Sequence, residues 1–212
     1  PDDKLLVLGG DHSVAMGSVS AAVTKGSVGV IWIDAHPDLN TDQTTPSGNI
    51  HGMPAAALLG FGHEKLTNIS PSTPAIETEN IIFIGLKDVD PPEGELIQKE
   101  NLTAFHIRDI LASGLGPIFN AIDKLNERVD HIWLSFDLDG VDADHAPGVG
   151  MPNKGGLTYR EIYAIIEYIG ETCDILGMDL VEYNPVNDIE HKTANLATEL
   201  VAKAFGKEYS WY

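Results

Sequence analysis

Three side chains that can bind a metal ion lie within five residues of one another, at Asp34, His36 and Asp38. They directly follow Val28–Ile33, a run of apolar and β-branched residues without charge. Such a run is typical of a buried strand in a parallel sheet. Alternation along an extended backbone places the three side chains on one face. Two carboxylates and an imidazole are costly to desolvate there, and a bound cation would remove that cost; a solvated acidic loop is the alternative for this segment alone.

Four further apolar segments are each followed by ionisable side chains: residues 5–8 by His12, residues 81–86 by Asp90, residues 131–136 by Asp137 and Asp139, and residues 175–181 by Glu182. A weaker strand is expected at residues 102–106. Segments of helical composition alternate with these strands, which predicts an α/β fold of three layers with a mostly parallel sheet covered on both faces. Because ligands bind outside the carboxyl ends of such strands, we expect these side chains to converge at one edge of the sheet. Their convergence would favour a functional site over a purely structural role.

The expected helices occupy the segments between the strands: residues 11–26, 52–60, a helix starting at Pro91, and residues 117–126, 158–172 and 192–205. The helix expected at residues 158–172 starts at a capping box formed by Thr158 and Glu161. We expect one domain, residues 1–212. Because the chain starts almost directly with a strand, we also expect it to lack an N-terminal portion of the natural domain.

Composition and charge exclude several classes of partner. The net charge of −19 argues against nucleic acid and anionic membranes as partners. No apolar run approaches membrane-spanning length. The single cysteine, Cys173, excludes an internal disulfide framework and suits a reducing compartment, so a cytoplasmic location is expected.

Two histidines and four aspartates make up the candidate metal ligands: His12, Asp34, His36, Asp38, Asp137 and Asp139. Six ligands are too many for one tetrahedral zinc ion, and they suit two divalent ions that share carboxylates. Ligation rich in oxygen favours Mn²⁺ or Mg²⁺, and the imidazoles favour Mn²⁺. Such an ion pair activates water, so we expect metal-assisted hydrolysis at a polarised carbon or phosphorus centre.

Four segments resemble the metal-binding motifs of the ureohydrolases, the family of arginases, agmatinases and formimidoylglutamases. The segments are GGDHS at residues 9–13, DAHPD at 34–38, SGNIHG at 47–52 and SFDLDG at 135–140. They occur in the order of the family, and the resemblance covers nearly the whole chain. It implies an arginase-like fold whose first strands are absent here, two Mn²⁺ ions per subunit, and a homo-oligomer, either a trimer or a hexamer.

The resemblance also implies a role for each ligand. One ion would be held by His12, Asp34, Asp38 and Asp137, and the other by Asp34, His36, Asp137 and Asp139, with Asp34 and Asp137 bridging. Asp38 would also hold a bridging hydroxide by a hydrogen bond. His51 would give a proton to the departing amine, and the Glu182 carboxylate would face the guanidinium group of the substrate.

The substrate is implied by a second set of positions. Asn40, Ser47 and Asn49 match the positions with which arginases hold the α-carboxylate, and Asp90 and Glu93 match those that read the α-amino group, partly through water. Agmatine lacks an α-carboxylate, so the similarity points to arginase, which converts L-arginine and water to L-ornithine and urea. Agmatinase or another ureohydrolase is the alternative within enzymes.

The loop at residues 148–156 departs from the family. Met151 stands where arginases usually carry threonine, and Lys154 stands where a small apolar residue is expected. A thioether cannot donate a hydrogen bond to a substrate. A second class of function therefore stays open, a catalytically weak arginase-like protein that binds or assembles. The intact set of metal ligands favours the enzyme.

Overall fold

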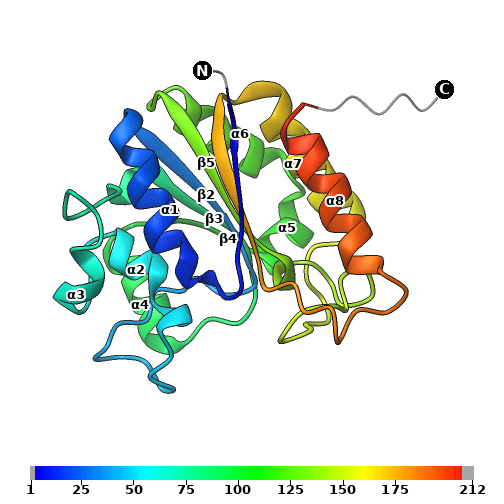
Figure 1. Ribbon diagram of the computed structural model, residues 1–212, viewed down its shortest axis with the longest axis horizontal. Coiled ribbons are helices and arrows are strands. Elements are labelled where there is room, and N and C mark those ends of the chain that lie inside the picture. Colours follow the sequence, from blue (N-terminus) through cyan, green and yellow to red (C-terminus); the bar gives the residue numbers. More distant parts are fainter. Residues whose placement is uncertain (1–2, 207–212) are drawn as a thin grey trace.

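The computed structural model describes residues 3–206 of the chain. Within this part, six parallel strands form one sheet at the centre of the molecule (Figure 1). The strands are β1 (Leu5–Leu8), β2 (Val28–Ile33), β3 (Ile81–Leu86), β4 (Thr103–His106), β5 (His131–Asp137) and β6 (Ile175–Val181). Their order in the sheet is β1-β6-β5-β2-β3-β4, and every neighbouring pair is parallel. The predicted parallel sheet is confirmed.

Helices cover both faces of this sheet (Figure 1). One side carries α1 (Ala15–Ala22), α2 (Pro54–Leu58), α3 (Glu64–Thr67) and α4 (Pro91–Lys99), and the other carries α5 (Ile107–Ser113), α6 (Gly116–Asn126), α7 (Tyr159–Thr172) and α8 (Lys192–Ala204). Short 3-10 turns lie at His12–Val14, Val23–Lys25, Ile50–Gly52, Thr78–Asn80 and Leu138–Gly140. No helix among the described residues has the length and apolar character needed to cross a bilayer.

The continuous apolar runs are explained by this layering, because each central strand faces a hydrophobic core on both sides. In β2, Val28, Val30 and Trp32 pack toward α1 and α2. The alternate residues Ile31 and Ile33 pack toward α6 and α7. Every residue of β2 is buried, so a polar side chain at any of these positions would lose hydration without compensation.

Three helical segments differ from the sequence prediction, and one of them is the four-residue α3 at Glu64–Thr67, where no helix was expected. The segment expected at residues 11–26 is helical, but only Ala15–Ala22 is regular α-helix and 3-10 turns flank it on both sides. Helix α5 was not predicted. It starts with an unusual capping pair, in which the His106 backbone N–H donates to Asp109 Oδ2 at 3.0 Å. Capping boxes are recognised by serine or threonine followed by glutamate or glutamine, so this pair gave no signal.

The capping box of α7 has the predicted form and provides a test of local stability. The Thr158 backbone N–H donates to Glu161 Oε2 at 2.8 Å, and the Glu161 N–H donates to Thr158 Oγ1 at 3.4 Å. Thr158→Ala should lower the free energy of unfolding by about 1 kcal/mol, as for a lost N-cap. Urea denaturation measures this change. Thr198→Ala, at an exposed position of α8, is the matched control and should change stability by less; equal losses would contradict the capping role.

Candidate active site

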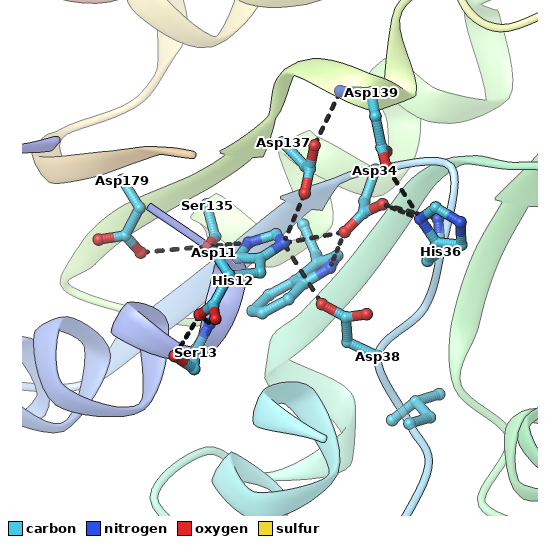
Figure 2. A network of polar contacts seen from close by, with 12 residues as sticks. Asp11, His12, Ser13, Asp34, His36, Asp38, Ser135, Asp137, Asp139 and Asp179 are labelled. Carbon is cyan, nitrogen blue, oxygen red and sulfur yellow. Dashed lines mark hydrogen bonds and ion pairs between the residues drawn. The ribbon is translucent and has the colours of Figure 1, made fainter. Parts of the chain in front are cut away.

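The carboxyl ends of the strands bring the sequence motifs together. His12 lies in the 3-10 turn after β1, Asp34 immediately follows β2, and Asp137 ends β5. Because all the strands are parallel, these ends meet at one edge of the sheet. Figure 2 shows the side chains of the three segments pointing toward one another from separate strands. The predicted convergence of the motifs is thereby confirmed.

His12 faces three carboxylates through one ring nitrogen. Its Nδ1 lies 2.9 Å from Asp34 Oδ2, 3.3 Å from Asp137 Oδ2 and 3.4 Å from Asp38 Oδ2. The imidazole also stacks on Trp32, with ring centroids 3.9 Å apart and planes inclined by 13°. The stacking fixes the plane of the ring, so Nδ1 is aimed at the centre of the carboxylate group.

His36 forms a second group beside the first. Its Nδ1 lies 3.2 Å from Asp34 Oδ1 and 3.2 Å from Asp139 Oδ2. The two oxygens of Asp34 therefore face different histidines, as expected for a shared carboxylate. Asp137 has the same local arrangement as Asp34, since its Oδ1 accepts the Asp139 backbone N–H at 2.7 Å just as Asp34 Oδ1 accepts the His36 N–H at 2.7 Å, and its Oδ2 faces His12. Its predicted contact with the second ion stays a prediction.

The electrostatics reflect the crowding of charge in a buried volume. Burial raises the pKa of Asp38 and Asp137, and the charge of Asp34 raises it further. Burial also opposes ionisation of Asp34, but hydrogen bonds from His12 and His36 outweigh it and lower that pKa. For His36, hydrogen bonds to Asp139 and Asp34 outweigh burial and raise the pKa to about 12. The group thus favours holding protons, or other positive charge, between its carboxylates.

The donor set fits divalent cations. His12, Asp34 and Asp137 form one cluster of possible ligands and Asp34, His36 and Asp139 form another, with the ligand atoms of each cluster within 4.8 Å of one another. Asp139 Oδ1 is buried and has no hydrogen-bond partner among the described residues. A buried carboxylate oxygen without a donor is costly, and a cation between the clusters would satisfy it. Carboxylates and imidazoles are suitable ligands for Mn²⁺.

A cavity of about 320 Å³ opens above these clusters. Its lining includes every residue predicted to contact substrate or transfer protons: Asn40, Ser47, Asn49, His51, Asp90, Glu93 and Glu182. Its volume is within the range of small-molecule sites. Neither lysine nor arginine is among its described lining residues, which include seven carboxylates. The cavity is therefore suited to a small cationic ligand.

Two acids of the site have unusual backbones. Asp38 has φ of 52° and Glu182 has φ of 65°, both in the left-handed region that residues other than glycine rarely occupy. Beside Glu182, a Cβ atom added to Gly150 would lie only 3.2 Å from Glu182 Oε2. The left-handed φ angles of Asp38 and Glu182 each cost about 1–3 kcal/mol. Backbone strain of this kind persists where surrounding contacts hold it, and it is concentrated at functional sites.

Helix α4 is tied to the loop that follows β2. Glu93 accepts the Leu39 and Asp90 backbone N–H groups, each at 2.9 Å, and is only 4% exposed. The Asn40 Nδ2 amide donates to Asp90 Oδ2 at 2.9 Å. Both carboxylate oxygens of Glu93 are thus engaged by backbone groups, which makes it a support for the loop; its predicted contact with substrate stays a prediction.

Sequence reasoning missed three residues around His12. Trp32 stacks on its ring, Ser135 lies 2.9 Å from its Nε2, and Asp179 contacts Ser135 at 3.1 Å. The one available signal was an acid inside the apolar strand β6, at Asp179. The histidines predicted to lie outside the site are absent from the cavity lining: His63, His106, His131, His145 and His191.

Comparison with known proteins identifies relatives with the same architecture. The model of the arginase family matches residues 2–206. An arginase of Brevibacillus brevis is 46% identical over 204 residues, covering 95% of this chain and 68% of the relative. The solved arginase of Bacillus caldovelox is 43% identical with a TM-score of 0.93, covering 97% of this chain and 69% of that one. The Entamoeba histolytica arginase solved with L-ornithine is 34% identical with a TM-score of 0.90, over 97% and 70% of the two chains.

Removal of one central carboxylate tests the metal centre. Asp137→Ala should abolish measurable Mn²⁺ binding. The Asp137 carboxylate contacts His12 Nδ1 and also accepts the backbone N–H of Asp139, so its loss disturbs ligands of both clusters. Equilibrium dialysis of the metal-free protein against Mn²⁺ measures the effect. Asp144→Ala, in the exposed part of the following loop, is the control and should bind Mn²⁺ as the unchanged protein does. Full metal occupancy in Asp137→Ala would contradict the assignment.

Proposed function

Because this chain belongs to the arginase family, we propose that it hydrolyses L-arginine to L-ornithine and urea. The observation that carries the proposal is the pair of clusters sharing Asp34 at the base of an acidic cavity. The names of the relatives support the same substrate. The positive guanidinium group of arginine suits a cavity whose described lining contains carboxylates and no lysine or arginine.

Two Mn²⁺ ions per chain are proposed as the cofactors. His12, Asp34, Asp38 and Asp137 would hold one ion, and Asp34, His36, Asp137 and Asp139 would hold the other; these residues are the predicted ligands. When bound, the ion pair would lower the pKa of water and supply a nucleophile at neutral pH. The contribution of the chain is to place four carboxylates where they offset the charge of both ions.

Glu182, Asp38 and His51 are proposed to act on the reacting groups. Glu182 lines the cavity beside Gly150, where its carboxylate can orient a planar guanidinium by paired hydrogen bonds. Asp38 orients the attacking water. The water oxygen bonds to the guanidinium carbon and the bond from that carbon to Nε of arginine breaks. Both hydrogens of the water pass to that nitrogen, one of them through His51, so that it leaves as the δ-amino group of ornithine. The products balance as urea and L-ornithine.

The outer part of the cavity is proposed to bind the α-carbon substituents. Ser47 and Asn49 are exposed on the loop after β2 and can donate hydrogen bonds to the α-carboxylate. Asp90 also lines the cavity and can accept a hydrogen bond from the α-amino group. Hydrogen bonds from such neutral donors can compensate the cost of desolvating the α-carboxylate of the substrate, although the surrounding charge is negative.

Agmatinase remains the second candidate, because one observation favours it. The Asn40 amide, predicted to hold the α-carboxylate, donates to Asp90 instead. Met151, the departure from the family pattern, supports a third candidate, a weakly catalytic binding protein. Its side chain lines the same cavity and is 59% exposed. A cytoplasmic location and a trimer or hexamer are also proposed, from the family resemblance.

Turnover of two substrates separates these candidates. After loading with Mn²⁺, the protein should release urea from L-arginine with a higher kcat/KM than from agmatine, because Ser47 and Asn49 gain hydrogen bonds only with the carboxylate. Urea release is the measurement. A preference for agmatine would overturn the proposed substrate, and no urea from either compound would favour the binding protein.

His51→Asn tests the proton-transfer role. The variant should keep its Mn²⁺ affinity and lose rate by about 10²–10⁴-fold, as for a lost general acid–base group. His191→Asn is the control, since His191 is exposed and its left-handed φ of 57° is tolerated by asparagine. Loss of metal in His51→Asn, or an unchanged rate at full occupancy, would refute the role.

A further inference from the structure

Asp179 is a buried acid that the proposed reaction does not use. It lies in β6 with 0% exposure, and among the described residues no lysine or arginine forms an ion pair with it. Taking a carboxylate out of water without a cationic partner is unfavourable. A chain that keeps such a group inside an apolar strand therefore needs a local reason for it.

The contacts of Asp179 lead to the proposed metal centre. Ser135 and Asp179 are paired in the register of β5 and β6, and Trp133 lies two residues before Ser135 on the same face. Trp133 Nε1 donates to Asp179 Oδ2 at 2.8 Å, and Ser135 Oγ donates to the same oxygen at 3.1 Å. Ser135 Oγ also lies 2.9 Å from His12 Nε2. Figure 2 shows this line of contacts from Asp179 through Ser135 to the ring of His12.

These contacts determine which ring nitrogen of neutral His12 carries the hydrogen. A serine hydroxyl has one hydrogen, and here it is directed to Asp179. Only the lone pairs of Ser135 Oγ then remain for His12, so Nε2 must be the donor. In a neutral ring, Nδ1 consequently has its lone pair free, and Nδ1 is the nitrogen that faces Asp34, Asp38 and Asp137.

We propose that Asp179 is a positioning residue that acts through Ser135 to keep the hydrogen of neutral His12 on Nε2, leaving Nδ1 free to bind a cation. The inference rests on the proposed metal centre. Trp32 stacking fixes the ring plane but is compatible with either tautomer. The hydrogen bonds from His12 through Ser135 to Asp179 determine which tautomer of His12 is present. Partners of this kind around metal-bound histidines contribute about 10–100-fold in metal affinity or activity.

Mn²⁺ affinity of the metal-free chain is the first measurement, with free Mn²⁺ followed by electron paramagnetic resonance. Asp179→Asn should weaken binding about 10-fold or more, and so should Ser135→Ala. Because Asp179 acts through Ser135, adding Asp179→Asn to Ser135→Ala should change the affinity by less than about 2-fold, the additivity error of independent sites. Circular dichroism of the metal-free variants verifies that each is folded.

Trp133→Phe provides the matched control. It removes the Trp133 hydrogen bond to Asp179 and leaves the contacts of Asp179 with Ser135 and of Ser135 with His12. This variant should lose thermal stability and keep its Mn²⁺ affinity within about 2-fold. At saturating Mn²⁺, Asp179→Asn should also keep the KM for L-arginine, because Asp179 does not line the cavity.

Two results would overturn the inference and leave the metal centre standing. One is an unchanged Mn²⁺ affinity in Asp179→Asn while the unchanged chain binds Mn²⁺. The other is an equal loss of affinity from Asp179→Asn whether or not Ser135 is present, which would mean that the acid acts without the serine. Failure of the unchanged chain to bind Mn²⁺ would instead refute the metal centre itself.

Discussion

The structure depends on the balance of charge among four carboxylates that share one buried volume. Asp34, Asp38, Asp137 and Asp139 are each at most 7% exposed, and their mutual repulsion grows as water is excluded. Two imidazoles can offset at most two of the four charges. Two divalent cations, with both imidazoles neutral, would offset all four. Protons and metal ions therefore compete for the same positions, and metal binding is expected to release protons.

The fold provides a rigid frame for this unfavourable group. Strands β2 and β5 are neighbours at the centre of the sheet and are buried on both faces, so their carboxyl ends are held by the hydrophobic cores rather than by the site. The left-handed backbones of Asp38 and Glu182 are held in turn by contacts around them, such as the Glu93 bond to the Leu39 N–H. Stability gained in the layers offsets strain and repulsion at the edge.

Much of this arrangement could be predicted from the sequence, because its causes are local or follow from parallel topology. The apolar runs gave β2 and β6 with the observed bounds, and Thr158 marked the start of α7. Once the strands are parallel, residues that follow them must meet at one edge, which placed His12 beside Asp34. The family resemblance added the roles of individual ligands.

Other features depend on pairing between strands and could not be predicted. Ser135 and Asp179 are 44 residues apart, and only the register of β5 and β6 makes them neighbours. The predicted substrate residue Glu93 has the right position in the cavity lining, yet both of its oxygens are bound by backbone N–H groups whose directions no sequence pattern specifies. The same holds for the amide of Asn40, which is directed to Asp90.

Anomalous diffraction at the manganese edge, from crystals grown with Mn²⁺, tests the shared site most directly. Two peaks about 3.5–4 Å apart are predicted, one in bonding contact with Nδ1 of His12 and the other with Nδ1 of His36, with Asp34 between them. A single peak, or peaks away from these histidines, would contradict the dinuclear centre on which the proposed arginine hydrolysis depends.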